Sequence, residues 1–221
     1  MNESRAREKI CAIGQSLFNR GYTHGTAGNI SLRIDDGWLI TATDACLGRL
    51  DPAEIAKMAT TGHLAEGVRP SKSLALHRAI YGQDSRLRAI VHTHSTSLVA
   101  LSLLGVWHPL CVVAPLTPYF VMKVGQIPLI RYHRPGSPQV IKLVVPHVHS
   151  ARGVLLERLG PVVWHSTLDE AAHALEELEQ SARLHLVLAN KGIAPLDEGQ
   201  IRDLAAAFNL SWQAEISVAA D

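Results

Sequence analysis

A two-strand hairpin set between helices is the feature that most constrains the fold. The stretch NISLRI alternates apolar and polar side chains, the turn Asp35-Asp36-Gly37 follows it, and residues 38–41 form a second strand. A helix over 3–20 precedes the hairpin, and a helix with Ser71 as its N-cap follows. This order favours one α/β domain on a mixed, largely antiparallel sheet.

The rest of the chain repeats this mixture. The sequence has 221 residues, of which 47% are apolar, enough to fill one sizeable core. We therefore expect residues 1–221 to form a single domain. The further elements predicted are strands at 87–94, 152–156 and 161–164, and helices at 97–104, 168–189 and 201–208.

Composition argues against several classes of partner. Only 19% of residues are charged and the net charge is +1, so we expect neither a nucleic-acid nor a membrane partner. The polar start MNESRAREKICAIG lacks the apolar core of a signal peptide. Three scattered cysteines form no disulfide framework, so we expect the protein to be cytoplasmic.

Two histidines stand where a buried strand ends. His92 and His94 are two residues apart, so on a strand their side chains point the same way, roughly 7 Å apart. Two imidazoles at that spacing can bind one divalent metal ion. The alternative is that both rings hydrogen-bond to the backbone. His147 and His149 share the spacing but precede their strand, which makes them a weaker candidate.

Three other stretches suit a phosphate. HGTAGNIS leaves backbone N–H groups accessible, ITATDAC follows a strand, and RPSKS opens a helix with hydroxyls and a lysine. A helix N-terminus with free N–H groups attracts anions. Each stretch alone could be an ordinary turn, but their order beside the histidine pair predicts a phosphate site.

In order and spacing, GTAGNIS, TATD, PSKS, VHTHS and GPVVW resemble the class II aldolase/adducin family, from about residue 5 to 190. The finer pattern, including ACLGRLDP, LTPYFVMKVG and IPLIRYHRPG, is similar to the 3-oxo-tetronate 4-phosphate decarboxylase branch. The resemblance implies a three-layer α/β/α fold, a divalent metal (usually Zn²⁺) and a homotetramer with active sites at subunit interfaces. It also implies a small phosphorylated sugar-acid substrate that yields dihydroxyacetone phosphate and CO₂.

The resemblance also assigns roles to single positions. His92 and His94 match two metal ligands, and Tyr119 falls in a segment that reaches a neighbouring subunit's site. The apolar stretch 115–124 around Tyr119 suits a subunit contact. Lys72 at the helix start is a candidate proton donor or partner for the substrate's anionic groups, the alternative being a solvated surface lysine. The positions that match phosphate-binding residues are Thr26, Asn29, Thr43 and Ser71.

Three positions depart from the family pattern. Asp44 replaces a glycine, Ser73 replaces the catalytic glutamate, and Leu159 replaces a metal-binding histidine. His24 and His77 are candidates for a third ligand, and His165 is a weaker one.

Losing the glutamate harms decarboxylation less than aldol chemistry, because a β-keto acid loses CO₂ without removal of a C–H proton. Two alternatives remain open at this point: a sugar-phosphate aldolase or epimerase, and a non-catalytic adducin-like oligomeric domain.

Overall fold

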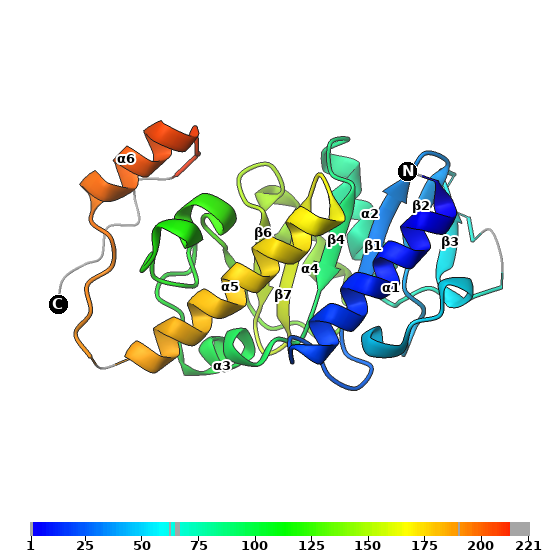
Figure 1. The fold of residues 1–221 in the computed structure, drawn as a ribbon, viewed down its shortest axis with the longest axis horizontal. Helices are drawn as coiled ribbons and strands as arrows, with labels where there is room; N and C mark the ends of the chain where they lie inside the picture. Colours follow the sequence, from blue (N-terminus) through cyan, green and yellow to red (C-terminus); the bar gives the residue numbers. More distant parts are fainter. Residues whose placement is uncertain (1, 62, 65–66, 190, 213–221) are drawn as a thin grey trace.

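The computed structural model describes residues 2–61, 63–64, 67–189 and 191–212. Within them, seven strands form one mixed sheet in the order β3-β2-β1-β4-β7-β6-β5 (Figure 1), and only the β5–β6 pair is parallel. The strands are β1 (Asn29–Ile34), β2 (Gly37–Ile40), β3 (Ala56–Ala59), β4 (Ala89–His92), β5 (Leu129–Ile130), β6 (Gly153–Leu156) and β7 (Gly160–His165). The α-helices are α1 (Glu3–Asn19), α2 (Leu74–Gln83), α3 (Thr96–Leu104), α4 (Pro138–Val144), α5 (Leu168–Leu188) and α6 (Glu198–Phe208).

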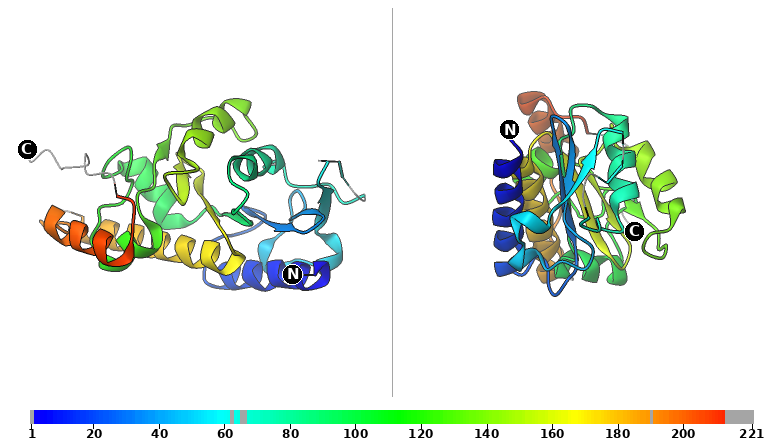
Figure 2. Two further views of the ribbon diagram at one scale, coloured as in Figure 1. Left: turned by 90° about the horizontal axis from the view of Figure 1, so that it is seen from above. Right: turned by 90° about the vertical axis from the view of Figure 1, so that its right-hand side faces the viewer.

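Helices cover both faces of this sheet. Figure 2 shows α1 and α5 on one face and α2 and α4 on the other, so the predicted three-layer α/β/α fold is confirmed. Side chains alternate accordingly along β4: Val91 packs in the core beneath α1 and α5, whereas Ile90 packs in the core that contains Ile80 of α2. Strand β4 lies mid-sheet between β1 and β7 and is buried on both faces.

Most elements lie where the sequence predicts them. The first helix ends at Asn19, and Gly21 follows with a φ of 76° that suits glycine. The strand predicted at 87–94 is shorter, because β4 ends at His92. No helix among the described residues is long and apolar enough to cross a bilayer.

The predicted start of α2 is wrong. The helix begins at Leu74, and its N-cap residue is Ser73, whose side chain makes no capping bond. Instead the Ser71 hydroxyl oxygen accepts a hydrogen bond from the Ser73 N–H at 3.2 Å, and the Ser71 carbonyl accepts one from Leu74 N–H at 3.0 Å. Residues 71–73 therefore form a separate turn that leads into the helix.

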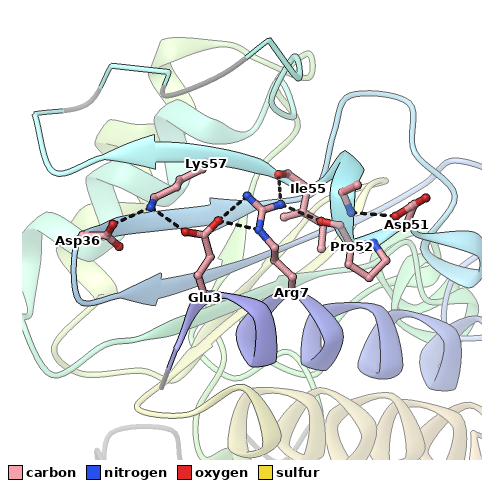
Figure 3. Close-up of polar contacts among 8 residues, drawn as sticks. Glu3, Arg7, Asp36, Asp51, Pro52, Ile55 and Lys57 are labelled. Carbon is pink, nitrogen blue, oxygen red and sulfur yellow. Dashed lines mark hydrogen bonds and ion pairs between the residues drawn. The ribbon is translucent and has the colours of Figure 1, made fainter.

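A polar network fastens α1 to the edge of the sheet (Figure 3). Lys57 of β3 donates to Glu3 at 2.7 Å and to Asp36 of the hairpin turn at 2.6 Å. Arg7 donates to Glu3 at 2.8 Å and to the carbonyl of Ile55 at 2.7 Å. The Lys57 ammonium, and then Arg7, lower the pKa of Glu3 below its usual value. These contacts hold the β1–β2 hairpin against α1, and the hairpin in turn positions the loop before β1.

Candidate active site

His92 closes β4 with a fixed ring orientation. Its side chain is 4% exposed, and Nδ1 lies 2.8 Å from the carbonyl oxygen of Pro161. A carbonyl only accepts, so Nδ1 carries the hydrogen and Nε2 keeps its lone pair. Burial first, and then His94, lower the pKa of His92 to about 4, although the Pro161 carbonyl opposes that shift. At neutral pH the ring is therefore uncharged, the form that binds metal ions.

His94 lies beyond the strand, yet its ring is close to that of His92. The ring centroids are 5.0 Å apart and the ring planes meet at 59°. Burial, and then His24, lower the pKa of His94. His94 lines a surface hollow together with His24, Arg158 and Leu159. The structure thus brings the two rings together through the turn after β4 rather than along one strand.

The HGTAGNIS loop packs directly on this strand end. Gly28 has a φ of 85°, and a Cβ there would lie 2.6 Å from the carbonyl oxygen of His92, so a side chain is excluded. Asn29 is paired with His92 in the β1–β4 ladder. Its Nδ2 donates to the Ser73 hydroxyl at 3.2 Å, while its buried Oδ1 has no partner among the described residues.

Of the other predicted phosphate residues, Thr43 and Ser71 lie on two loops that contact each other. An isolated bridge between Ala42 and Pro70 joins the two loops, where the Thr43 N–H donates to the Arg69 carbonyl at 3.0 Å. Ser71 follows in the turn before α2. Thr26 is exposed on the loop before Gly28, and no contact ties it to the other three.

Asp44 and Lys72 flank this group at the surface. Asp44 has a φ of 58°, which explains why glycine suits this position, and aspartate tolerates it. Its side chain is 75% exposed and lies 3.9 Å from the Lys72 ammonium, itself 70% exposed. The carboxylate of Asp44, which would repel a phosphate, therefore has the Lys72 ammonium beside it.

A cavity of about 80 Å³ opens beside the 71–73 turn. His77 and His92 line it together with Lys72, Ser73 and the loop between β5 and α4. Sequence reasoning weighed His77 only as a metal ligand and missed the basic loop residues as site components. The run RYHR before Pro135-Gly136 was the available signal.

The donor set fits a divalent metal only in part. His92 and His94 offer two neutral imidazoles, but no three His, Cys, Asp or Glu side chains of the described residues are placed to hold a metal ion. Neither His24 nor His77 completes the set. Leu159, a hydrocarbon side chain, lines both the hollow at His94 and the cavity at His92.

Tyr119 and His165 lie elsewhere. Tyr119 is 60% exposed and lines a separate depression with Arg152, His165 and Glu170. His165 is 2.9 Å from Glu170, so it is engaged there and not at the His92 site. Tyr119 therefore lies away from the histidine pair of its own chain.

The fold and the histidine pair define a class II aldolase-like α/β/α domain. The chain belongs to the family described as Class II Aldolase and Adducin N-terminal domain, whose model matches residues 8–186. Class II aldolases of this family depend on a divalent metal.

The chain is 58% identical to a 3-oxo-tetronate 4-phosphate decarboxylase of Cupriavidus necator, over 95% of this chain and 99% of that one. It is 41% identical to the protein of that name in Escherichia coli, over 91% and 96% of the two chains. A solved structure, YgbL from Escherichia coli, described as a putative aldolase/epimerase/decarboxylase, superposes with a TM-score of 0.87 at 40% identity, covering 91% and 98%.

Proposed function

We propose that this chain is a lyase that decarboxylates a 3-oxo-tetronate 4-phosphate to dihydroxyacetone phosphate and CO₂. The observation that carries the proposal is the 58% identity, over nearly the whole of both chains, to the Cupriavidus necator decarboxylase. The neighbouring rings of His92 and His94, and the hydrogen bonds that join Asn29, Ser71 and Ser73, support the proposal.

In this proposal His92 and His94 bind a divalent metal, and zinc is the expected ion. A metal held there would supply a Lewis acid for the substrate carbonyl and the enediolate left by CO₂. The Pro161 carbonyl keeps Nε2 of His92 free for that bond. With Leu159 contributing no donor, substrate oxygens would fill the remaining positions, so we expect weak binding in the absence of substrate.

The substrate phosphate binds beside the turn before α2. Thr26, Thr43 and Ser71 donate hydroxyl hydrogens, and the Asn29 amide contributes its NH₂ group after a 180° turn that lets Oδ1 accept from Ser73. The N-terminal end of α2 and Lys72 add positive potential there. Lys72 is also the proposed acid that protonates carbon after CO₂ leaves.

Ser73 at the usual glutamate position favours decarboxylation over aldol cleavage or epimerisation. Loss of CO₂ from a β-keto acid gives the enediolate directly, so no base has to remove a proton from carbon. The Ser73 hydroxyl, occupied by Asn29, is too weak a base for the other two reactions.

We further propose a cytoplasmic homotetramer in which Tyr119 reaches a neighbouring subunit's site. Tyr119 is 60% exposed and lies away from the histidine pair of its own chain, while Phe120 packs in the core. Two leucines at the end of α3, Leu103 and Leu104, are 53% and 79% exposed, which suits a subunit contact. The three cysteines are free, as in a reducing compartment.

The test is incubation of the purified chain, with zinc, with both stereoisomers of 3-oxo-tetronate 4-phosphate, measuring CO₂ and dihydroxyacetone phosphate. We expect equal amounts of the two products from one isomer, and none from the His92→Ala/His94→Ala variant. Cleavage of a ketose phosphate to an aldehyde without CO₂ would identify an aldolase instead. A correctly folded chain with no activity on any of these substrates would favour a non-catalytic domain, because Ser73 and Leu159 stand where the family pattern has a catalytic glutamate and a metal-binding histidine.

A further inference from the structure

The cavity beside His92 has a polar floor and apolar walls. It lies between α2, the β5–α4 loop and the β6–β7 turn, and its floor includes His77 and His92. Lys72 and Ser73 stand at one side of it, next to the proposed phosphate site. The apolar lining includes Leu76, Ile130, Val140, Leu156 and Val162. A small ligand group entering here is therefore held by the few polar atoms that the cavity offers.

A chain of hydrogen bonds fixes which nitrogen of His77 carries hydrogen. The Tyr81 hydroxyl donates to the Arg88 carbonyl at 3.2 Å, so it accepts from the Ser31 hydroxyl 2.8 Å away. Having donated to Tyr81, the Ser31 oxygen accepts from His77 Nδ1 at 2.8 Å. Nε2 of His77 therefore bears a lone pair.

That lone pair has no partner. His77 is 1% exposed, and its Nε2 makes no hydrogen bond to any described residue. Burial first, and then His92, lower the pKa of His77 to about 3, so the ring stays neutral at pH 7 and Nε2 can only accept. A buried acceptor left unpaired costs free energy, and a ligand hydroxyl that reaches Nε2 from the cavity would relieve that cost.

The mouth of the cavity is basic. Arg131, His133 and Arg134 come from the β5–α4 loop, and Lys72 also lines the cavity. Glu157 is the acidic residue of the lining, and it is already engaged by Arg131 at 3.4 Å and by the Tyr132 N–H at 2.7 Å. Within the described part of the chain, Arg134 has no carboxylate partner, so its planar guanidinium is available for a ligand carboxylate.

We propose that this cavity is the subsite for the 2-hydroxycarboxylate end of the substrate. The carboxylate pairs with Arg134 at the mouth, and the neighbouring hydroxyl donates to Nε2 of His77 on the floor. This assignment rests on the proposed function, because it takes the substrate to be a sugar-acid phosphate. The phosphate and the carboxylate then occupy separate subsites, and a sugar phosphate without a carboxylate fills only one of the two.

The experiment measures binding of three unreactive probes by calorimetry to the full chain with zinc. Tetronate 4-phosphate has both groups but no ketone, tetritol 4-phosphate lacks the carboxylate, and 2-deoxytetronate 4-phosphate lacks the hydroxyl. We expect the wild type to bind the first probe about ten- to hundredfold more tightly than the second, as for a hydrogen-bonded ion pair. The third should bind at least about fivefold more weakly than the first.

Arg134→Gln should bind tetronate and tetritol 4-phosphates almost equally, at the wild-type affinity for the tetritol. Arg202→Gln in α6, whose guanidinium is 3.1 Å from Glu198, is the matched control and should retain the wild-type preference. The deoxy probe tests His77 without a substitution in the core.

Equal affinity of the wild type for the carboxylate and tetritol probes, or an undiminished preference in Arg134→Gln, would overturn the carboxylate assignment. Full affinity for the deoxy probe would overturn the role of His77. These outcomes are separate from the reaction itself: a wild type that prefers tetronate 4-phosphate yet releases no CO₂ from the 3-oxo acid would refute the proposed function and leave the subsite standing.

Discussion

The turn that carries His94 leads into α3, and a carboxylate from another helix accepts hydrogen bonds from N–H groups in the first turn of α3. Glu179 of α5 is 8% exposed, and its two oxygens accept from the N–H groups of Ser97 at 2.8 Å and Leu98 at 3.0 Å. Glu179→Ala removes both bonds and leaves two donors unpaired. Bonds to a charged group contribute about 1.5–3 kcal/mol each, but burial raises the pKa of Glu179, a sign that its charge is costly there. We therefore expect a net loss of about 3 kcal/mol in the free energy of unfolding.

Urea unfolding followed by circular dichroism measures this loss, at one protein concentration because the proposed assembly would also stabilise the fold. Glu179→Gln keeps one acceptor and should lose about half as much. Glu177→Ala is the control on the same helix, since Glu177 accepts one bond from Ser181 at 3.3 Å, and it should cost under about 1 kcal/mol. If Glu179→Ala unfolds at the same urea concentration as the control, the capping role is wrong.

Four further predictions concern the site. In a titration with zinc, His92→Ala/His94→Ala should lose the binding that the wild type shows while keeping its circular dichroism; wild-type zinc affinity in this variant would remove the ligand assignment. Leu159→His places an imidazole on the wall shared by the hollow at His94 and the cavity at His92. It should raise zinc affinity at least about tenfold in chelator competition. An unchanged affinity would count against a metal site between these two histidines. Ser71→Ala should lower kcat/KM about ten- to hundredfold on the phosphorylated substrate but not on its unphosphorylated analogue; an equal penalty on both would mean a purely structural serine. The pKa of His77 is about 3 in the folded chain and about 6.5 in the unfolded chain, so the unfolded chain binds the proton more readily. The contribution of neutral His77 to the free energy of unfolding is therefore complete above about pH 6.5. It falls on acidification by up to about 1.4 kcal/mol per pH unit. Urea unfolding at pH 7, 6 and 5 in a chelator should show a shallower slope for His77→Gln, and an identical slope would assign the effect to other groups.

Local pattern predicted much of the fold. The period of α1 and α5 and the alternation in the β1–β2 hairpin reflect which side each side chain presents to the core, and that information is local. The residue at which α2 begins is not determined by the local sequence. Ser71 is held by the Thr41 carbonyl, 3.1 Å from its N–H, in a loop contact that delays the helix until Leu74. A serine before an apolar run carries no sign of such a contact.

The candidate site also contains features that the sequence predicts and features that it does not. Proximity of His92 and His94 was predictable from their spacing, although the rings meet through a turn and not along a strand. The cavity was not predictable, because its floor depends on Ser31 of β1 meeting His77 and Tyr81 of α2, residues remote in sequence. The metal, phosphate and proton-donor roles remain predictions.

The orientation of the His92 ring depends on a main-chain atom, the carbonyl oxygen of Pro161, and therefore tolerates substitution of neighbouring side chains. A carbonyl cannot be deleted by exchanging a side chain. The geometry instead depends on Gly160 nearby, where a Cβ would stand 2.2 Å from the Thr93 carbonyl oxygen. Position 159 can therefore drift from histidine to leucine, and back, without turning the ring of His92. In the proposed metal site, the direction of Nε2 of His92 therefore stays the same whichever residue occupies position 159, while the affinity for metal can vary.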